Sequence, residues 1–245
     1  MNFLGLSFNA LALQEVRDAL LARPPEAQFG YVVTPNVDHL DRLRRNPALK
    51  PVYDAALLRL FDSRCLFHAA RLLGHAPPPV VTGADLTAAL LPHLGGRRVA
   101  VVGLNSQVFA ALRARYPAIE FRHHNPPMGL LENPEAFSAA SRFARGSGAS
   151  FIFFAVGSPT QEALAHALWR EGEAAGVGLC IGAALEFAAG TRRRAPGWMR
   201  RAGLEWLFRL ALEPRRLAGR YLLRGPLGVA LLLAQDAGFR ARSSE

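Results

Sequence analysis

The feature that most limits the possible folds is a short apolar run, SFIFFAVG at residues 150–157, which contains no charged residue. Such a run is typical of a strand buried on both faces of a sheet. Similar short runs come at Tyr31–Thr34, Arg98–Gly103, Ile119–Arg122 and Val177–Ile181, with longer helix-type stretches between them. This repeated order of strand, turn and helix predicts an α/β fold, a Rossmann-like parallel sheet flanked by helices.

The turns that follow these runs are the expected place for a binding site, because ligands of parallel sheets bind outside the carboxyl ends of the strands. Polar and small residues fill these turns. They are Thr34–Asn36, Asp62–Ser63, Gly103–Asn105, Gly157–Glu162 and Gly182–Ala184.

The turn GSPTQE at residues 157–162 is the strongest of these candidates. The free N–H groups at the start of the following helix, which we expect to begin at Pro159, suit a diphosphate. Gln161 adds a side chain that can bind a sugar or a base. The alternative is an ordinary turn in which Ser158 caps the helix. The turn at Gly103–Ser106 is a weaker example of the same pattern.

Asp62 allows two interpretations. It follows the apolar residues Leu57–Phe61 and precedes a helix-type stretch, so it could cap that helix or act as a general base at a strand end.

His123 and His124 are adjacent, and neighbouring side chains of a strand point to opposite faces. Since no third ligand is spaced near them, we expect no metal site.

The positive charge is concentrated in the last 55 residues. The net charge is +10, and residues 191–245 hold 12 arginines against 4 acidic residues, which gives +8. We therefore predict a catalytic α/β domain over residues 1–190 and a basic helical appendage over residues 191–245. Arginine interleaved with Trp and Phe could bind nucleic acid, an anionic membrane or a diphosphate.

Other features concern the cellular location. Cys65 and Cys180 lie far apart without a CxxC motif, which favours a reducing cytosol over a disulfide or zinc framework. The N-terminal segment lacks the pattern of a signal peptide. The longest apolar run, Pro226–Ala234, is about half of what a membrane span needs. We expect a protein that can touch a membrane without crossing it.

Several of these stretches, taken in order, resemble the bacterial glycosyltransferase family named WecG/TagA/CpsF. The match is collinear from about Tyr31 to Leu222. Its segments are TPNVDHL (34–40), FDSRCLFHAARLLG (61–74), VTGADL (81–86), VAVVGLNSQVF (99–109), NPPMGL (125–130), VGSPTQEA (156–163) and the block from GAALEF to GRYL (182–222).

The resemblance implies an inverting, metal-independent transfer from a UDP-sugar to a polyprenyl-diphosphate-linked saccharide in surface polysaccharide synthesis, with no cofactor. It implies that Asp62 is the base and that Thr34 and Asn36 belong to the active site. Two positions depart from the family pattern. Ser63 stands where the family has Gly, and Val80 stands where several members have Arg. The expected donor-binding residues are Gly157, Ser158, Gln161, Glu162, Gly103 and Asn105.

The resemblance also gives the appendage a role in binding the diphosphate and the lipid head, for which we select Arg194, Arg209, Arg216 and Arg220. The implied location is cytoplasmic, peripheral on the inner face of the plasma membrane, and homo-oligomerisation is left open. Two alternatives are an inactive family member that acts as a membrane scaffold and a basic nucleic-acid-binding protein. The second alternative leaves the ordered turn motifs unexplained, so we expect no nucleic-acid partner.

Overall fold

The centre of the molecule is a six-stranded sheet in which every strand pairs in parallel with its neighbours, in the order β4-β3-β8-β7-β5-β6. The computed structural model describes residues 1–219 and 229–230. The strands of the sheet are β3 (Gly30–Val33), β4 (Leu58–Arg59), β5 (Arg98–Gly103), β6 (Glu120–His124), β7 (Phe151–Ala155) and β8 (Val177–Cys180). A short antiparallel ribbon, β1 (Asn2–Phe3) and β2 (Leu6–Ser7), precedes them. The predicted Rossmann-like α/β fold is confirmed.

Strand β7 is buried on both faces, as its apolar sequence predicts. Ile152 and Phe154 point into one hydrophobic core, whereas Phe151 and Phe153 point into the other. This follows from the two-residue period of a strand, which sends successive side chains to opposite faces. The sheet therefore separates two cores and fixes the ends of its strands rigidly.

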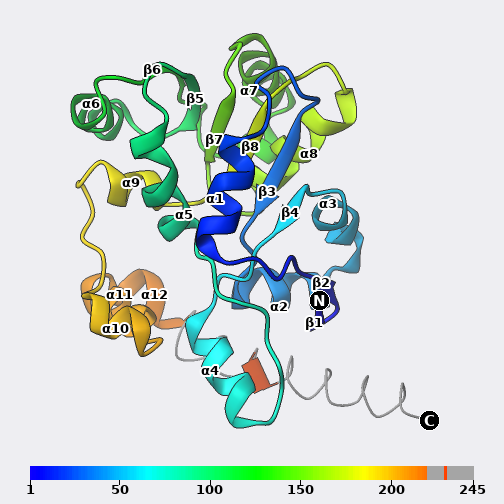
Figure 1. Ribbon diagram of the computed structural model, residues 1–245, viewed down its shortest axis with the longest axis vertical. Helices are drawn as coiled ribbons and strands as arrows, with labels where there is room; N and C mark the ends of the chain where they lie inside the picture. The colour runs from blue at the N-terminus through cyan, green and yellow to red at the C-terminus, as the bar shows by residue number, and fades with distance from the viewer. Residues whose placement is uncertain (220–228, 231–245) are drawn as a thin grey trace.

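Helices cover both faces of the sheet (Figure 1). One core takes its helical side chains from α2, α3, α4, α7 and α8, and the other from α1, α5, α6 and α9. The bounds of the helices on the two faces are α1 (Leu13–Leu21), α2 (Val37–Arg45), α3 (Lys50–Asp54), α4 (Arg64–Leu72), α5 (Gly83–Leu90), α6 (Ser106–Arg115), α7 (Pro134–Gly146), α8 (Thr160–Glu171) and α9 (Ala184–Ala188). Three 3-10 turns complete the core, η1 (Pro47–Leu49), η2 (Leu91–His93) and η3 (Leu130–Glu132).

The start of α8 differs from the sequence prediction. The helix begins at Thr160, one residue later than expected, and Pro159 precedes it after a cis peptide bond. Ser158 makes no capping hydrogen bond to α8. Its hydroxyl instead accepts a hydrogen bond from Nη1 of Arg42 at 2.7 Å, so the alternative in which Ser158 caps this helix is wrong.

Three short helices of the basic segment lie together beside α4 (Figure 1). They are α10 (Gly197–Arg201), α11 (Glu205–Leu212) and α12 (Pro214–Ala218). Nε2 of His68 on α4 donates to the carbonyl of Arg201 at 3.0 Å. Gly203 has φ +75° and lies so close to Cys65 that a Cβ would sit 3.1 Å from its backbone nitrogen. The predicted boundary at residue 190 falls in the loop between α9 and α10.

Within the two described ranges, no helix combines the length and the apolar character that crossing a bilayer requires.

Candidate active site

Three chain segments meet where β3 and β4 end. The backbone nitrogen of Asp62 donates to the carbonyl of Pro35 at 3.0 Å, and that of Val81 donates to the carbonyl of Phe61 at 2.9 Å. Oδ2 of Asp62 then accepts a hydrogen bond from the backbone nitrogen of Gly83, at the start of α5, at 2.9 Å. These bonds fix the Asp62 carboxylate at the carboxyl edge of the sheet, where a ligand of such a fold binds.

Ser63, not Asp62, caps α4. The Ser63 hydroxyl accepts a hydrogen bond from the backbone nitrogen of Leu66 at 3.2 Å. The capping interpretation of Asp62 is therefore wrong, and its carboxylate is not tied to α4. Ser63 has φ −156°, an extended conformation that any residue adopts, so the position does not require the glycine of the family pattern.

The surroundings of Asp62 make it a stronger base than an ordinary aspartate. Burial raises the pKa of its carboxyl to about 6, against the lowering effect of the Gly83 hydrogen bond. The negative charges of Glu205 and Asp85 raise this pKa further, and His39 lowers it. At neutral pH the group is mostly ionised and can accept a proton.

Thr34 lies next to this carboxylate in the fold. Thr34 follows β3, is buried, and its Oγ1 donates to the carbonyl of Cys180 at 3.4 Å. A Cβ on Gly83 would come within 3.2 Å of Thr34 Oγ1 and 3.4 Å of the Ile181 backbone. Because Gly83 has no side chain, the start of α5 can approach the ends of β3 and β8. Thr34 and Asp62 therefore both lie beside Gly83.

Three arginines from distant parts of the chain converge on Asp85, in the first turn of α5. Oδ2 of Asp85 accepts from Arg64 at 2.8 Å, and Oδ1 accepts from Arg194 at 2.8 Å and from Arg200 at 3.3 Å. Burial opposes ionisation of this group, but Arg194 and Arg64 hold the pKa of Asp85 below its usual value. Arg194 also donates to Oγ1 of Thr82 at 3.2 Å. Asp85 thus joins the appendage to the core.

The arginine cluster retains unused hydrogen-bonding capacity. Nε of Arg194 lies 3.6 Å from Oε1 of Glu205. In the described part of the chain, the buried Nε atoms of Arg194, Arg200 and Arg209 have no hydrogen-bond partner. The guanidinium groups of Arg64, Arg194 and Arg200 face only two carboxylates, those of Asp85 and Glu205. The cluster therefore carries a formal excess of positive charge, which suits an anion.

Two of the selected arginines cannot be placed. The side chain of Arg216 and the whole of Arg220 lie outside the described residues. Arg194 and Arg209 are the two whose positions the structure gives.

A second polar network lies at the ends of β3, β7 and β8. Gln161 and Glu162, in the first turn of α8, are 3% and 2% exposed. The Gln161 amide accepts from the backbone nitrogen of Gly182 at 3.0 Å and donates to Oε1 of Glu162 at 2.7 Å. Nε2 of His39 lies 3.3 Å from the same oxygen, and its Nδ1 lies 2.7 Å from Oδ1 of Asn36. One chain of hydrogen bonds therefore connects the three strand ends.

The Glu162 carboxylate is held in its ionised form. Burial alone would raise its pKa, but the hydrogen bond and charge of His39 and the Gln161 amide lower it below the usual value. His39 was not selected from the sequence, although its three-residue spacing from the helix cap Asn36 places the two side chains together. Direct contact of Gln161 or Glu162 with a donor stays a prediction.

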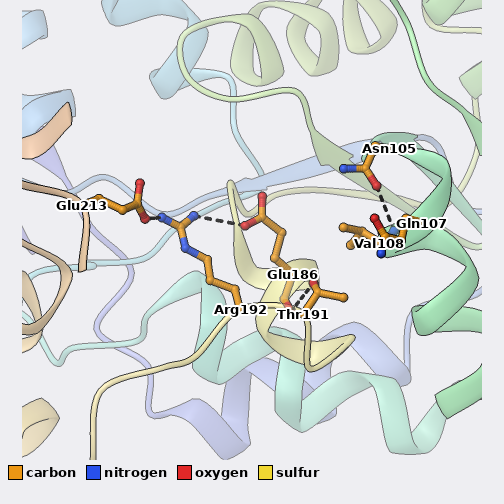
Figure 2. Close-up of a pocket in the computed structure, with 7 residues that line it drawn as sticks. All are labelled: Asn105, Gln107, Val108, Glu186, Thr191, Arg192 and Glu213. Carbon is orange, nitrogen blue, oxygen red and sulfur yellow. Dashed lines mark hydrogen bonds and ion pairs between the residues drawn. The ribbon is translucent and has the colours of Figure 1, made fainter. Parts of the chain in front are cut away.

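The Gly103–Asn105 turn borders a pocket of about 620 Å³ between the core and the appendage (Figure 2). A Cβ on Gly103 would lie 2.7 Å from the Ala155 carbonyl oxygen, so glycine is needed at this turn. Asn105 caps α6 by accepting from the backbone nitrogen of Val108 at 2.9 Å. Arg192 crosses the pocket and pairs with Glu186 of α9, at 3.1 Å, and with Glu213 at the start of α12.

The two adjacent histidines have structural surroundings. His123 donates to the carbonyl of Gly103 at 2.9 Å and stacks on Phe109, with ring centres 3.9 Å apart. His124 stacks on Phe143. Over residues 1–219 and 229–230, no three His, Cys, Asp or Glu side chains gather as metal ligands would.

Comparison with known protein families gives a match over nearly the whole chain. The family model described as "Glycosyl transferase WecG/TagA/CpsF family" matches residues 1–242. The match includes the Asp62 site, the Gln161 network and the basic segment, and it confirms the resemblance read from the ordered motifs.

Proposed function

The chain belongs to the WecG/TagA/CpsF family and is a glycosyltransferase, and we propose that it moves a sugar from a UDP-sugar to a polyprenyl-diphosphate-linked saccharide. The reaction would serve bacterial surface polysaccharide synthesis and invert the anomeric carbon. The observation that carries this proposal is the position of the Asp62 carboxylate, which the backbone nitrogen of Gly83 holds at the carboxyl edge of the sheet; burial also raises its pKa to about 6.

The chemical step needs a base on the acceptor side. A hydroxyl of the acceptor attacks the anomeric carbon, its oxygen forms the new glycosidic bond, and its proton passes to Asp62. The bond from the anomeric carbon to UDP breaks, and UDP leaves with the electron pair. Asp62 suits this role because Gly83 fixes one carboxylate oxygen, while its raised pKa strengthens it as a proton acceptor.

The departing diphosphate needs positive charge. Arg64, Arg194 and Arg200 supply it around Asp85, and the buried Nε atoms of Arg194 and Arg200 have no hydrogen-bond partner among the described residues. Guanidinium groups bind phosphate oxygens by paired, charge-assisted hydrogen bonds. We propose that they take the charge-neutralising role in this transfer, so that no metal ion is required.

The pocket beside Asn105 offers room for the rest of the donor. Its lining combines Asn105, which caps α6, and Gln107 of that helix with Thr191 and Arg192 from the start of the basic segment (Figure 2). Amide and hydroxyl groups of this kind bind the polar edges of a base or a ribose. We propose that the uridine lies in this pocket and that the appendage closes one side of it.

We further propose that the protein works at the inner face of the plasma membrane. Residues 191–245 carry +8 of the net charge. Arg193, Arg201 and Arg215 are exposed in the described part of the segment, and Trp198 is 60% exposed. Basic side chains near an anionic bilayer contribute about 1 kcal/mol each to binding, and Trp favours the lipid–water interface.

A donor screen tests this function. A panel of UDP-sugars is incubated with a polyprenyl-diphosphate-linked acceptor in EDTA, and the anomeric configuration of the product is determined. We expect transfer with inversion from one or a few donors. Activity that EDTA abolishes and Mg²⁺ or Mn²⁺ restores would contradict the metal-free mechanism. Membrane binding without transfer from any donor would instead favour the scaffold alternative.

A further inference from the structure

The end of α4 exposes two adjacent large apolar side chains. Leu72 is 87% exposed and Leu73 is 64% exposed. The opposite side of the same helix is anchored, since Leu66 and Ala70 are fully buried in the core. Single exposed leucines are common on soluble proteins. Two together at the end of a helix that extends from the core (Figure 1) form a small apolar projection.

The stretch of chain around this projection contains no acidic residue. From Ser63 to Gly83 the sequence has no Asp or Glu. Arg71 precedes the two leucines, is exposed, and its guanidinium lies 5.9 Å from the centre of the Phe67 ring. An anionic surface would therefore meet only neutral or positive groups along this stretch of the chain.

Helix α10 lies beside the first half of α4 and exposes side chains of a similar type. The hydrogen bond from His68 to the carbonyl of Arg201 and the close approach of Gly203 to Cys65 hold α4 beside α10 and its following turn. On α10, Trp198 is 60% exposed and Arg201 is also exposed. Exposed leucine, tryptophan and arginine side chains are typical of segments that lie in the interface of an anionic bilayer.

We propose that the end of α4, Arg71–Leu73, is a second membrane contact, formed by the catalytic domain and separate from the basic appendage. The occupant is the anionic lipid surface, into which Leu72 and Leu73 insert. This inference rests on the proposed action on a lipid-linked acceptor, and it adds a contact that positions the active site.

The position of α4 explains what this contact achieves. The helix begins directly after the Asp62–Ser63 turn and has nine residues. At a rise of 1.5 Å per residue, its two ends are about 13 Å apart. Insertion of Leu72 and Leu73 would therefore hold the Asp62 carboxylate within about this distance of the lipid surface. A saccharide attached to a membrane-bound carrier is presented at that height above the bilayer.

The test compares full-length protein with the double variant Leu72→Ser/Leu73→Ser. Met128→Ser is the matched control, because Met128 is 97% exposed in the loop after β6. Binding to vesicles of equal parts phosphatidylglycerol and phosphatidylcholine is measured by co-sedimentation at low and at high salt. Salt screens the arginines but not the apolar contact. We expect the double variant to bind at least about tenfold more weakly, most clearly at high salt, because lost leucine burial weakens partitioning.

Two activity measurements accompany the binding assay. Transfer to a short water-soluble acceptor should be unchanged in the double variant, whereas transfer to a lipid-linked acceptor in vesicles should fall. Circular dichroism and urea unfolding check that the fold is retained. Equal vesicle binding by the wild type and the double variant, or no binding by the wild type, overturns the α4 contact.

The outcomes separate this inference from the proposed function. If the double variant loses vesicle binding but no donor supports transfer in the wild type, the membrane contact stands and the proposed reaction is wrong. If soluble transfer proceeds and the two leucines make no difference to vesicle binding, the reaction stands and the contact is wrong.

Discussion

Asp62 is partly buried and Glu162 fully buried near the carboxyl edge of the same sheet, and their surroundings shift their pKa values in opposite directions. Burial raises the pKa of Asp62 to about 6, and the neighbouring carboxylates of Glu205 and Asp85 add to the shift. Glu162 receives hydrogen bonds from His39 and Gln161, which lower its pKa despite burial. The number of donors and the sign of the nearby charges, rather than burial alone, distinguish the two groups.

The difference assigns them different work. A carboxylate with a raised pKa is suited to taking a proton, whereas one that is held ionised by its donors is suited to fixing the backbone around it. Glu162 does this through Gln161, whose amide binds the backbone of Gly182. We therefore propose that the chemistry takes place after β4 and that the residues after β7 support the site, and three experiments test that division.

The largest expected effect is on turnover. We expect Asp62→Asn to lower kcat by at least about 10², because the variant loses the group that accepts the proton while keeping its shape. Steady-state kinetics with the donor identified in the screen measure this change, and UDP affinity should remain near that of the wild type. The matched control is Asp54→Asn, which removes an exposed carboxylate paired with Lys50 at 2.6 Å. Near wild-type turnover in Asp62→Asn would move the base elsewhere, with Asp38 the next candidate.

The second effect is on stability and has opposite signs at the two sites. We expect Glu162→Gln to lose about 2 kcal/mol at pH 7–8 in urea unfolding, because the pairing with His39 is broken. The folded-state pKa of Glu162 is depressed. Its contribution is therefore present above the unfolded-state pKa, near 4.5, and is lost as pH falls through the folded value. Its kcat should fall less than tenfold.

Asp62→Asn supplies the contrasting measurement. The folded-state pKa of Asp62 is raised from 3.8 to about 6, so the folded protein binds this proton more tightly than the unfolded chain does. The protonated carboxyl therefore favours the folded state. This contribution is fully present below pH 3.8 and is lost as pH rises through 6. The Asn variant should therefore be more stable than the wild type at pH 8, by about 1 kcal/mol after allowance for its partial exposure. A loss of stability in both variants would remove the distinction between the two sites.

The smallest expected effect is a change in the pKa of Asp62 when a charge of the appendage is removed. Glu205, on α11, is a carboxylate whose charge raises the pKa of Asp62. We expect Glu205→Gln to move the acid limb of the kcat/KM profile from about pH 6 downward by a few tenths of a pH unit. Glu120→Gln, on the exposed edge strand β6, is the control. An unchanged or upward-shifted limb in Glu205→Gln would mean that the appendage does not tune the base.

Local patterns predicted the framework of the site. The apolar run at 150–157 identified β7, and small polar turns after the strands marked the carboxyl edge where Asp62 and Gln161 lie. The prediction was less accurate for ends and caps. Ser158 contacts Arg42 instead of capping α8, and the capping role offered for Asp62 belongs to Ser63. Which of two neighbouring polar residues caps a helix depends on small differences in backbone geometry, and the residue type does not reveal these differences.

The sequence by itself determined the parallel α/β framework, the concentration of positive charge after residue 190 and the family, because strand and helix periods, charge and ordered motifs are properties of consecutive residues. The tertiary structure decided which charges meet. It joined Arg64 and Arg194 at Asp85 and brought Glu205 near Asp62. Electrostatic energies depend on distances in space and on burial, and these are fixed only when segments far apart in the chain pack together.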